Sequence, residues 1–389
     1  DETASQPSVL QRIETPSTAG GEPNLFLADD GTLYLSWIEY LNDSLDALKF
    51  ARLDEAAWST PREIARSSNW FVNWADFPSL VSYGKAQTLA VHWLQKSAEG
   101  TYDYDVHVSQ STDGGDSWSD SFVLHKDGIP AEHGFVSMIP AEEDRVFATW
   151  LDGRHTKTGD AIDSHGHGHG GAMTLRGAYF DAGHTIYDDQ QLDGRICDCC
   201  QTDAAMTNVG PVVVYRDRSE KEVRDIYLVR QEHGKWSTPQ PVFEDNWLIA
   251  GCPVNGPAIS AQGNELAVAW YSRANDKPQV KVAFSSDGGA SFSDPVRVDD
   301  GDPLGRVDIV SNNGEYIVTW LENEADSTFV KCAGVTQQGV SDKQRLVSIS
   351  AARSSGFPVL ERWQDGFVLA WTAVDAAGDT RIQTAIVNL

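Results

Sequence analysis

The feature that most constrains the fold is an internal repeat that runs through the chain. Each copy is a short strand, a turn rich in Asp, Asn and Gly, and an apolar strand that closes on an aromatic residue, as in NLFLADDGTLYLSW. The closing residues are Trp37, Trp93, Trp150, Tyr215, Trp270, Trp320 and Trp371. They are separated by 56, 57, 65, 55, 50 and 51 residues. A period of this length is typical of one blade of a β-propeller.

Each repeat continues with a third and a fourth predicted strand, for example residues 47–53 and 61–65 of the first copy. Four antiparallel strands repeated around an axis leave only short, protected sheet edges. The sequence therefore predicts an all-β fold, a β-propeller of seven four-stranded blades, with six blades as the alternative.

The last repeat ends at Leu389 after three strands. We expect residues 8–15 to supply its fourth strand and close the ring, while residues 1–7 are flexible. On this interpretation residues 1–389 form a single propeller domain.

Charge and composition narrow the range of partners. The 30 Lys and Arg residues are outnumbered by 57 Asp and Glu residues, so the formal net charge is −27. Such a chain is a poor partner for nucleic acid or an anionic membrane surface. With 41% hydrophobic residues it can still bury a large core. No apolar run approaches the length of about 18 residues that a membrane span requires.

The chain opens on an acidic segment, without the basic and apolar regions of a signal peptide. Together with the acidity and the Trp-rich repeats, this start suggests a periplasmic or extracellular protein whose signal peptide has been removed. A cytoplasmic protein with free thiols is the alternative.

Two predicted turns between third and fourth strands share a pattern, STDGGDSW at 111–118 and SSDGGASF at 285–292. Asp and Ser side chains can bind turn N–H groups, and Gly permits positive φ. The pattern resembles the Asp-box, or BNR repeat, of sialidase-like propellers. The matching residues are Ser111, Asp113, Gly115, Trp118, Ser285, Asp287, Gly289 and Phe292. The resemblance implies that these turns are structural and lie opposite the active site.

The other face should carry the loops from second to third strands and the links between blades. In the sialidases that the repeats resemble, three arginines hold a carboxylate, a Tyr activated by a Glu is the nucleophile, and an Asp is the acid/base. Candidate catalytic residues here are Glu39, Tyr40, Asp76, Asp152 and Tyr271, and Glu322, His133 and Arg353 share this face. Candidate ligand-binding residues are Arg154, Arg216, Arg218, Arg273 and Arg306, because guanidinium groups bind carboxylates with two hydrogen bonds. Ion pairs between blades are the alternative for the first three of these arginines.

Cysteines and histidines form the most specific cluster of the sequence. Cys197, Cys199 and Cys200 lie in the link into blade four, and Cys252 lies in the link into blade five. The long loop of blade three adds three histidines that alternate with glycine, His165, His167 and His169. Thiolates and imidazoles are ligands for copper and zinc.

Other interpretations of this cluster stay open. Cys252 could form a disulfide with Cys199 or Cys200 in an oxidising compartment, the thiols could be an inert buried cluster, and the histidines could belong to a solvated loop. Asp198 could orient a metal ligand, and Cys332 is expected to be a core thiol.

These observations favour an exported sialidase-like propeller with a copper or zinc site beside an arginine-lined pocket. Its partner would be a small anionic ligand or a glycan. The alternatives are an exo-sialidase-like glycoside hydrolase acting on acidic glycans, and a non-catalytic propeller that binds a glycan or a protein.

Overall fold

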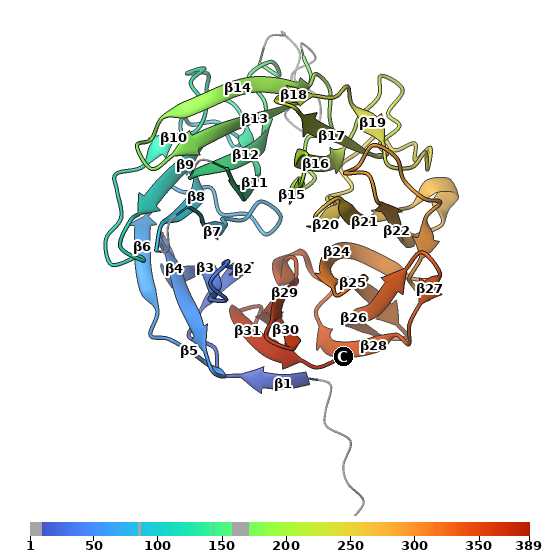
Figure 1. Cartoon of the computed structure of the whole chain (residues 1–389). Helices are drawn as coiled ribbons and strands as arrows, with labels where there is room; N and C mark the ends of the chain where they lie inside the picture. The colour runs from blue at the N-terminus through green and yellow to red at the C-terminus, as the bar shows by residue number, and fades with distance from the viewer. Residues whose placement is uncertain (1–9, 85–86, 143, 158–170) are drawn as a thin grey trace, which may run out of the picture.

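The computed structural model describes residues 10–84, 87–142, 144–157 and 171–389. They form a ring of seven antiparallel sheets around a central axis (Figure 1). The predicted seven-bladed, four-stranded propeller is confirmed. The predicted His165, His167 and His169 lie outside the described residues.

The strands of each blade run from the centre of the ring outward. Blade one contains β2 (Gly20–Leu27), β3 (Leu33–Asn42) and β4 (Leu45–Asp54), with β5 (Ala57–Trp58) and β6 (Arg62–Ser67) both on β4. Blade two contains β7 (Leu80–Ser82), β8 (Leu89–Lys96), β9 (Tyr104–Ser111) and β10 (Phe122–Val123). Blade three contains β11 (His133–Ala141), β12 (Arg145–Asp152), β13 (Thr174–Asp181) and β14 (Ile186–Asp193).

The remaining blades repeat the arrangement. Blade four contains β15 (Asp203–Thr207), β16 (Gly210–Arg216) and β17 (Ile226–Glu232), with β18 (Lys235–Trp236) and β19 (Gln240–Pro241) on β17. Blade five contains β20 (Ala258–Gln262), β21 (Glu265–Ser272), β22 (Gln279–Ser285) and β23 (Val296–Arg297), with the short helix η1 (Ala274–Asp276). Blade six contains β24 (Pro303–Asn312), β25 (Glu315–Glu324) and β26 (Ser327–Thr336), with β27 (Gly339–Val340) and β28 (Gln344–Ile349) on β26. After η2 (Arg353–Ser355), blade seven contains β29 (Val359–Trp363), β30 (Gly366–Val374) and β31 (Thr380–Val387).

The N-terminal strand closes the ring, as predicted. Strand β1 (Leu10–Ile13) pairs antiparallel with β31, from Leu10 opposite Val387 to Ile13 opposite Thr384. Blade seven is therefore built from both ends of the described chain (Figure 1). No helix among the described residues is long and apolar enough to cross a membrane.

The repeated aromatic residue of the second strands packs into the core. Trp37, Trp150, Trp270 and Trp320 are completely buried, and Trp371 is nearly so. Each of these tryptophans belongs to an apolar cluster that also contains residues of a neighbouring blade. A large aromatic ring removes much apolar surface from water, so the repeated aromatic position stabilises the packing of blade on blade.

Polar side chains join the inner strands of neighbouring blades. The N–H of Ile259 donates to Asp203 at 2.8 Å, and the N–H of Leu360 donates to Asp308 at 2.7 Å. Ser260 accepts from the N–H of Ser311, and Asn24 accepts from the N–H of Leu80. We call these four bonds the inner-ring contacts. They cross between sheets that do not share a strand ladder.

The two Asp-box-like turns lie between third and fourth strands. In the first, Ser111 accepts from the N–H of Gly115, and Asp113 accepts from the N–H and hydroxyl of Ser117. In the second, Ser285 and Asp287 make the equivalent bonds. In an antiparallel blade, this end is opposite the end that carries the second-to-third loops and the links between blades. We call that opposite end the link face.

We predict that Asp308→Ala lowers the free energy of unfolding by about 1–3 kcal/mol, because it leaves the buried N–H groups of Ile309 and Leu360 without their acceptor. Urea denaturation measures this change. Asp342→Ala, at an exposed aspartate of the same blade, should change stability by less than about 0.5 kcal/mol. Equal effects of the two substitutions would show that the inner-ring contact does not stabilise the ring.

Candidate metal centre on the link face

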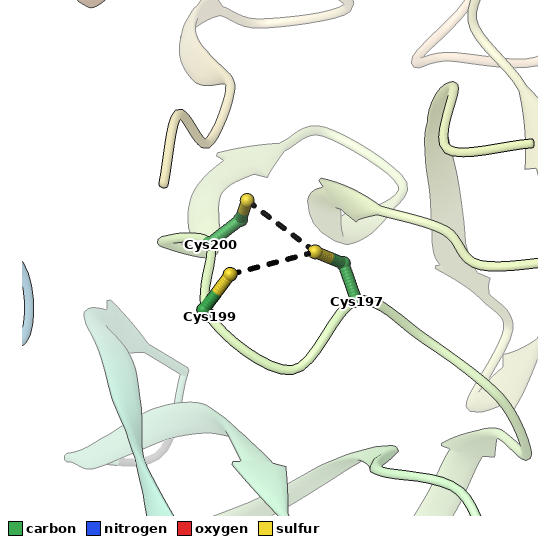
Figure 2. Close-up of side chains that lie close together, drawn as sticks. All are labelled: Cys197, Cys199 and Cys200. Atoms are coloured by element: carbon green, nitrogen blue, oxygen red, sulfur yellow. Dashed lines mark hydrogen bonds between the residues drawn. The ribbon is translucent and has the colours of Figure 1, made fainter. Parts of the chain in front are cut away.

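Three cysteines of the link between β14 and β15 point toward one another (Figure 2). The Sγ atom of Cys197 lies 3.5 Å from that of Cys200 and 3.9 Å from that of Cys199. Cys252 arrives from the link between β19 and β20, and its thiol forms a hydrogen bond with the Cys199 thiol. The structure thus brings three of the four predicted cysteine ligands within 4.8 Å of one another, with Cys252 near Cys199. We call these four cysteines the thiol cluster.

Backbone contacts hold the start of this link in place. The N–H of Cys197 donates to the carbonyl of Arg216, and the N–H of Ile196 donates to the carbonyl of Met173. Ile196 is completely buried, and Cys197 and Cys200 are buried as well. Cys199 is half-buried and Cys252 is exposed. The cluster therefore has a fixed inner side and one thiol that solvent can reach.

Charged side chains surround the buried sulfur atoms. The guanidinium of Arg224 donates to Sγ of Cys197 at 3.2 Å, and Glu222 holds Arg224 at 2.8 Å. Burial raises the pKa of Cys197, but hydrogen bonds from Cys199 and Cys200 and the charge of Arg224 outweigh it, so that this pKa lies well below its usual value. Cys197 is therefore the thiol best prepared to bind a metal as a thiolate.

The separations of the Cys197 sulfur from those of Cys199 and Cys200 suit a shared metal ion better than a disulfide. A disulfide requires sulfur atoms about 2.05 Å apart, and the five cysteines, all within the described residues, are free. In a tetrahedral site with metal–sulfur bonds of about 2.3 Å, neighbouring sulfur atoms lie about 3.8 Å apart. The observed distances of 3.5 and 3.9 Å are close to that value. Cys332, predicted as a core thiol, is completely buried in β26.

Two of the candidate arginines are buried and bind backbone carbonyls. Arg216 donates to the carbonyls of Asn255, Tyr271 and Arg224 at 2.6–3.0 Å. Arg306 donates to the hydroxyl of Ser355 and to the carbonyls of Gly356 and Ala352. Both guanidinium groups thereby connect segments of different blades.

The other candidate arginines lie nearer to solvent. Arg154 forms ion pairs with Asp152 at 2.6 Å and with Asp127 at 3.1 Å, the latter between blades. Arg218 pairs with Asp198, between two cysteines of the thiol cluster, at 2.9 Å. Arg273 is exposed. That these arginines bind an anionic ligand stays a prediction.

Three candidate carboxylates accept hydrogen bonds from the buried tryptophans. The indole N–H of Trp37 donates to Glu39 at 2.7 Å, and Trp150 and Trp320 donate to Asp152 and Glu322 in the same way. The acid stands two residues after the tryptophan each time. This repeated Trp-x-Asp/Glu triplet is a sequence signal for a structural role, although each acid taken singly resembles a catalytic candidate.

The candidate tyrosines have different surroundings. The hydroxyl of Tyr40 donates to Glu22 at 2.9 Å, and burial raises the pKa of Glu22 to about 7. Tyr271 is buried, and its ring meets that of Trp247 edge to face.

Asp76 belongs to a buried group that the sequence does not reveal. The hydroxyl of Tyr104 lies 3.2 Å from Asp76 and 3.0 Å from Glu132, and Asp76 also accepts from the N–H of Phe135. Burial raises the pKa of Asp76 to about 7 and that of Glu132 well above its usual value. A side chain at Gly134 would place its Cβ 2.1 Å from the Asp76 carboxylate, so this position requires glycine. Since these residues come from separate strands and links, no spacing in the sequence indicates that they meet.

Comparison with known proteins supports the fold. No family model and no curated protein matches the sequence. An ulvan lyase of the polysaccharide lyase family PL25 matches with a TM-score of 0.53 and 12% identity over 84% of this chain and 81% of that chain. A protein of unknown function from Dyadobacter fermentans matches with a TM-score of 0.52 and 11% identity over 98% and 97% of the two chains. The NanB sialidase from Streptococcus pneumoniae matches with a TM-score of 0.45 and 10% identity over 99% and 71%. At these identities the first two matches show a shared fold alone.

We predict that Cys252 is the first thiol to react with a disulfide reagent such as 5,5′-dithiobis(2-nitrobenzoate) in the folded protein. It is exposed, and a hydrogen bond from Cys199 lowers its pKa, which favours the reactive thiolate. Absorbance at neutral pH measures the reaction. Cys252→Ala should remove the fast phase and Cys332→Ala should leave it. A fast phase that survives Cys252→Ala would contradict the arrangement of the cluster.

Proposed function

We propose that this propeller binds one thiophilic metal ion, copper(I) or zinc(II), through Cys197, Cys199, Cys200 and Cys252. The observation that carries the proposal is the pair of sulfur–sulfur distances, 3.5 and 3.9 Å, which suit ligands of a common metal and are far too long for a disulfide. Thiolate sulfur binds copper(I) and zinc(II) in preference to hard cations.

The charges around the thiol cluster support the proposal. Several thiolates around one ion leave an excess of negative charge. Arg224, which contacts Cys197, and Arg218, which is paired with Asp198, supply positive charge beside the sulfur atoms. Asp198 holds Arg218, so we propose that it positions charge around the site. His165, His167 and His169 remain proposed as further ligands.

The different exposure of the four thiols suggests how an ion would reach the site. Cys252 lies at the surface, while Cys197 and Cys200 are buried behind Cys199. An ion would meet the exposed thiol first and would then be held by the buried ones. The ring supports the two links, so we expect the ligand atoms to keep their positions whether or not a metal ion is bound.

We predict that the reduced protein binds about one copper(I) or zinc(II) ion per chain and that Cys199→Ser removes this stoichiometric binding. Mass spectrometry of the native protein and elemental analysis measure the metal content. Cys332→Ser, which removes a thiol remote from the cluster in the core of blade six, should bind metal as the wild type does. A protein without metal affinity, in which Cys252 is found in a disulfide by intact mass, would overturn the proposal.

A second candidate function is the cleavage of an acidic carbohydrate. It is favoured by Tyr104, whose hydroxyl lies between the carboxyl groups of Asp76 and Glu132. Two carboxyl groups with raised pKa values, together with a tyrosine, are suited to proton transfer near neutral pH. The propeller fold is also that of an ulvan lyase, although the fold by itself does not determine function.

This candidate predicts turnover of an acidic polysaccharide such as ulvan, or of a fluorogenic sialoside, with a loss of at least about 100-fold in Asp76→Asn because a proton-transfer group is removed. Product formation by chromatography or fluorescence measures the activity. Asp342→Asn, on the surface of blade six, is the control. Absence of turnover by the folded wild type across such a panel would exclude the candidate.

A further inference from the structure

A second group of potential ligands lies between blades two and three and uses none of the cysteines. His133 is the first residue of β11 and stands opposite Asp152, the last residue of β12, in the strand ladder. The link after β10 adds His125 and Asp127, and β9 adds Asp105. One ligand atom from each of Asp127, His133 and Asp152 lies within 4.8 Å of the others.

The hydrogen bonds of His133 determine which ring nitrogen could bind a metal ion. Its Nδ1 atom lies 3.1 Å from the carbonyl of Ala131 and 3.2 Å from that of Tyr104. Because a carbonyl only accepts, Nδ1 carries the proton. Among the described residues, no well-aligned hydrogen bond reaches the Nε2 atom, although the residue is completely buried. It faces Asp127 Oδ2 at 3.3 Å and Asp152 Oδ1 at 3.7 Å.

His125 orients one of these carboxylates. The N–H of Val106 lies 3.4 Å from Nε2 of His125, so this nitrogen is an acceptor. The other ring nitrogen, Nδ1, lies 2.9 Å from Oδ2 of Asp127. The two imidazole rings stack with centroids 3.7 Å apart.

We propose that this group is a binding site for a divalent cation, with Nε2 of His133 and carboxylate oxygens of Asp127 and Asp152 as its ligands. A hydrogen bond donated by the other ring nitrogen to a carbonyl, as in His133, is the usual support of a metal-binding histidine. For metal–ligand bonds of about 2.1 Å, neighbouring tetrahedral ligands lie about 3.4 Å apart. The observed separations are 3.3 and 3.7 Å.

The local charge favours a cation. Asp105, Asp127 and Asp152 contribute three negative charges, and Arg154, which holds Asp127 and Asp152 from one side, contributes one positive charge. A divalent ion bound at Nε2 of His133 would neutralise the remaining two negative charges.

The donor atoms also select the class of ion. One imidazole nitrogen and two carboxylate oxygens form a harder ligand set than the thiol cluster and suit manganese(II) as well as zinc(II). Manganese(II) has little preference for thiolates, so it can report on this site separately from the thiol cluster. The proposal is therefore independent of the function proposed above.

The test is a titration of the chelator-treated full chain with manganese(II), followed by electron paramagnetic resonance of the free ion. We expect about one ion per chain, and an affinity at least about tenfold lower in His133→Ala and in Asp127→Asn. Circular dichroism verifies that both variants are folded. Asp127→Asn keeps the size of the side chain, so it tests the site even if His133→Ala fails to fold.

Two further variants serve as controls. His92→Ala removes another completely buried histidine, which lies against Ser79 and whose Nε2 has no partner in the described part of the chain. This variant should bind manganese(II) as the wild type does. Cys197→Ser should also leave this affinity unchanged. The proposal is overturned if the wild type binds no manganese(II), if folded Asp127→Asn binds it equally well, or if Cys197→Ser removes the binding.

Discussion

The ring depends on how one inner strand is held against the next. Neighbouring sheets share no strand ladder, so the innermost strands would meet only through side chains. A polar residue on one inner strand accepts the N–H of the following blade instead, as Asp203 does for Ile259 and Asp308 for Leu360. Such a bond between buried groups is favourable mainly because leaving the N–H unpaired costs free energy. The inner-ring contacts thus position blade two against blade one and join blades four to seven in turn. The buried aromatic residues fill the space between blades.

The ring geometry determines which residues can meet to form a functional site. Because the chain alternates direction within a blade, every link between blades reaches the same face. Cys197 and Cys252 are 55 residues apart in the sequence, about one repeat, and they meet because consecutive links lie side by side. The same principle brings His133 and Asp152 beside Asp127. The positions of these ligand residues are therefore set by the ring geometry more than by the flexibility of their loops.

Much of this architecture was predictable from the sequence. The spacing of the aromatic residues predicts seven blades, and the missing last strand predicts the role of β1. The site was only partly predictable. Adjacent cysteines indicate a cluster. Glu39 and Asp152 stay catalytic candidates, but the sequence does not reveal that each also accepts a hydrogen bond from a tryptophan two residues earlier. Tyr104 and Glu132 meet Asp76 only in three dimensions, since buried polar groups with distant partners have no periodic pattern.

The proposed function depends on the thiol cluster, and X-ray absorption at the metal edge tests this cluster most directly. For the zinc-loaded protein, we expect a first shell dominated by sulfur at about 2.3 Å, with at least the three sulfur atoms of Cys197, Cys199 and Cys200. A shell made only of nitrogen and oxygen atoms would contradict the proposed site, because the ion would then lie elsewhere on the propeller.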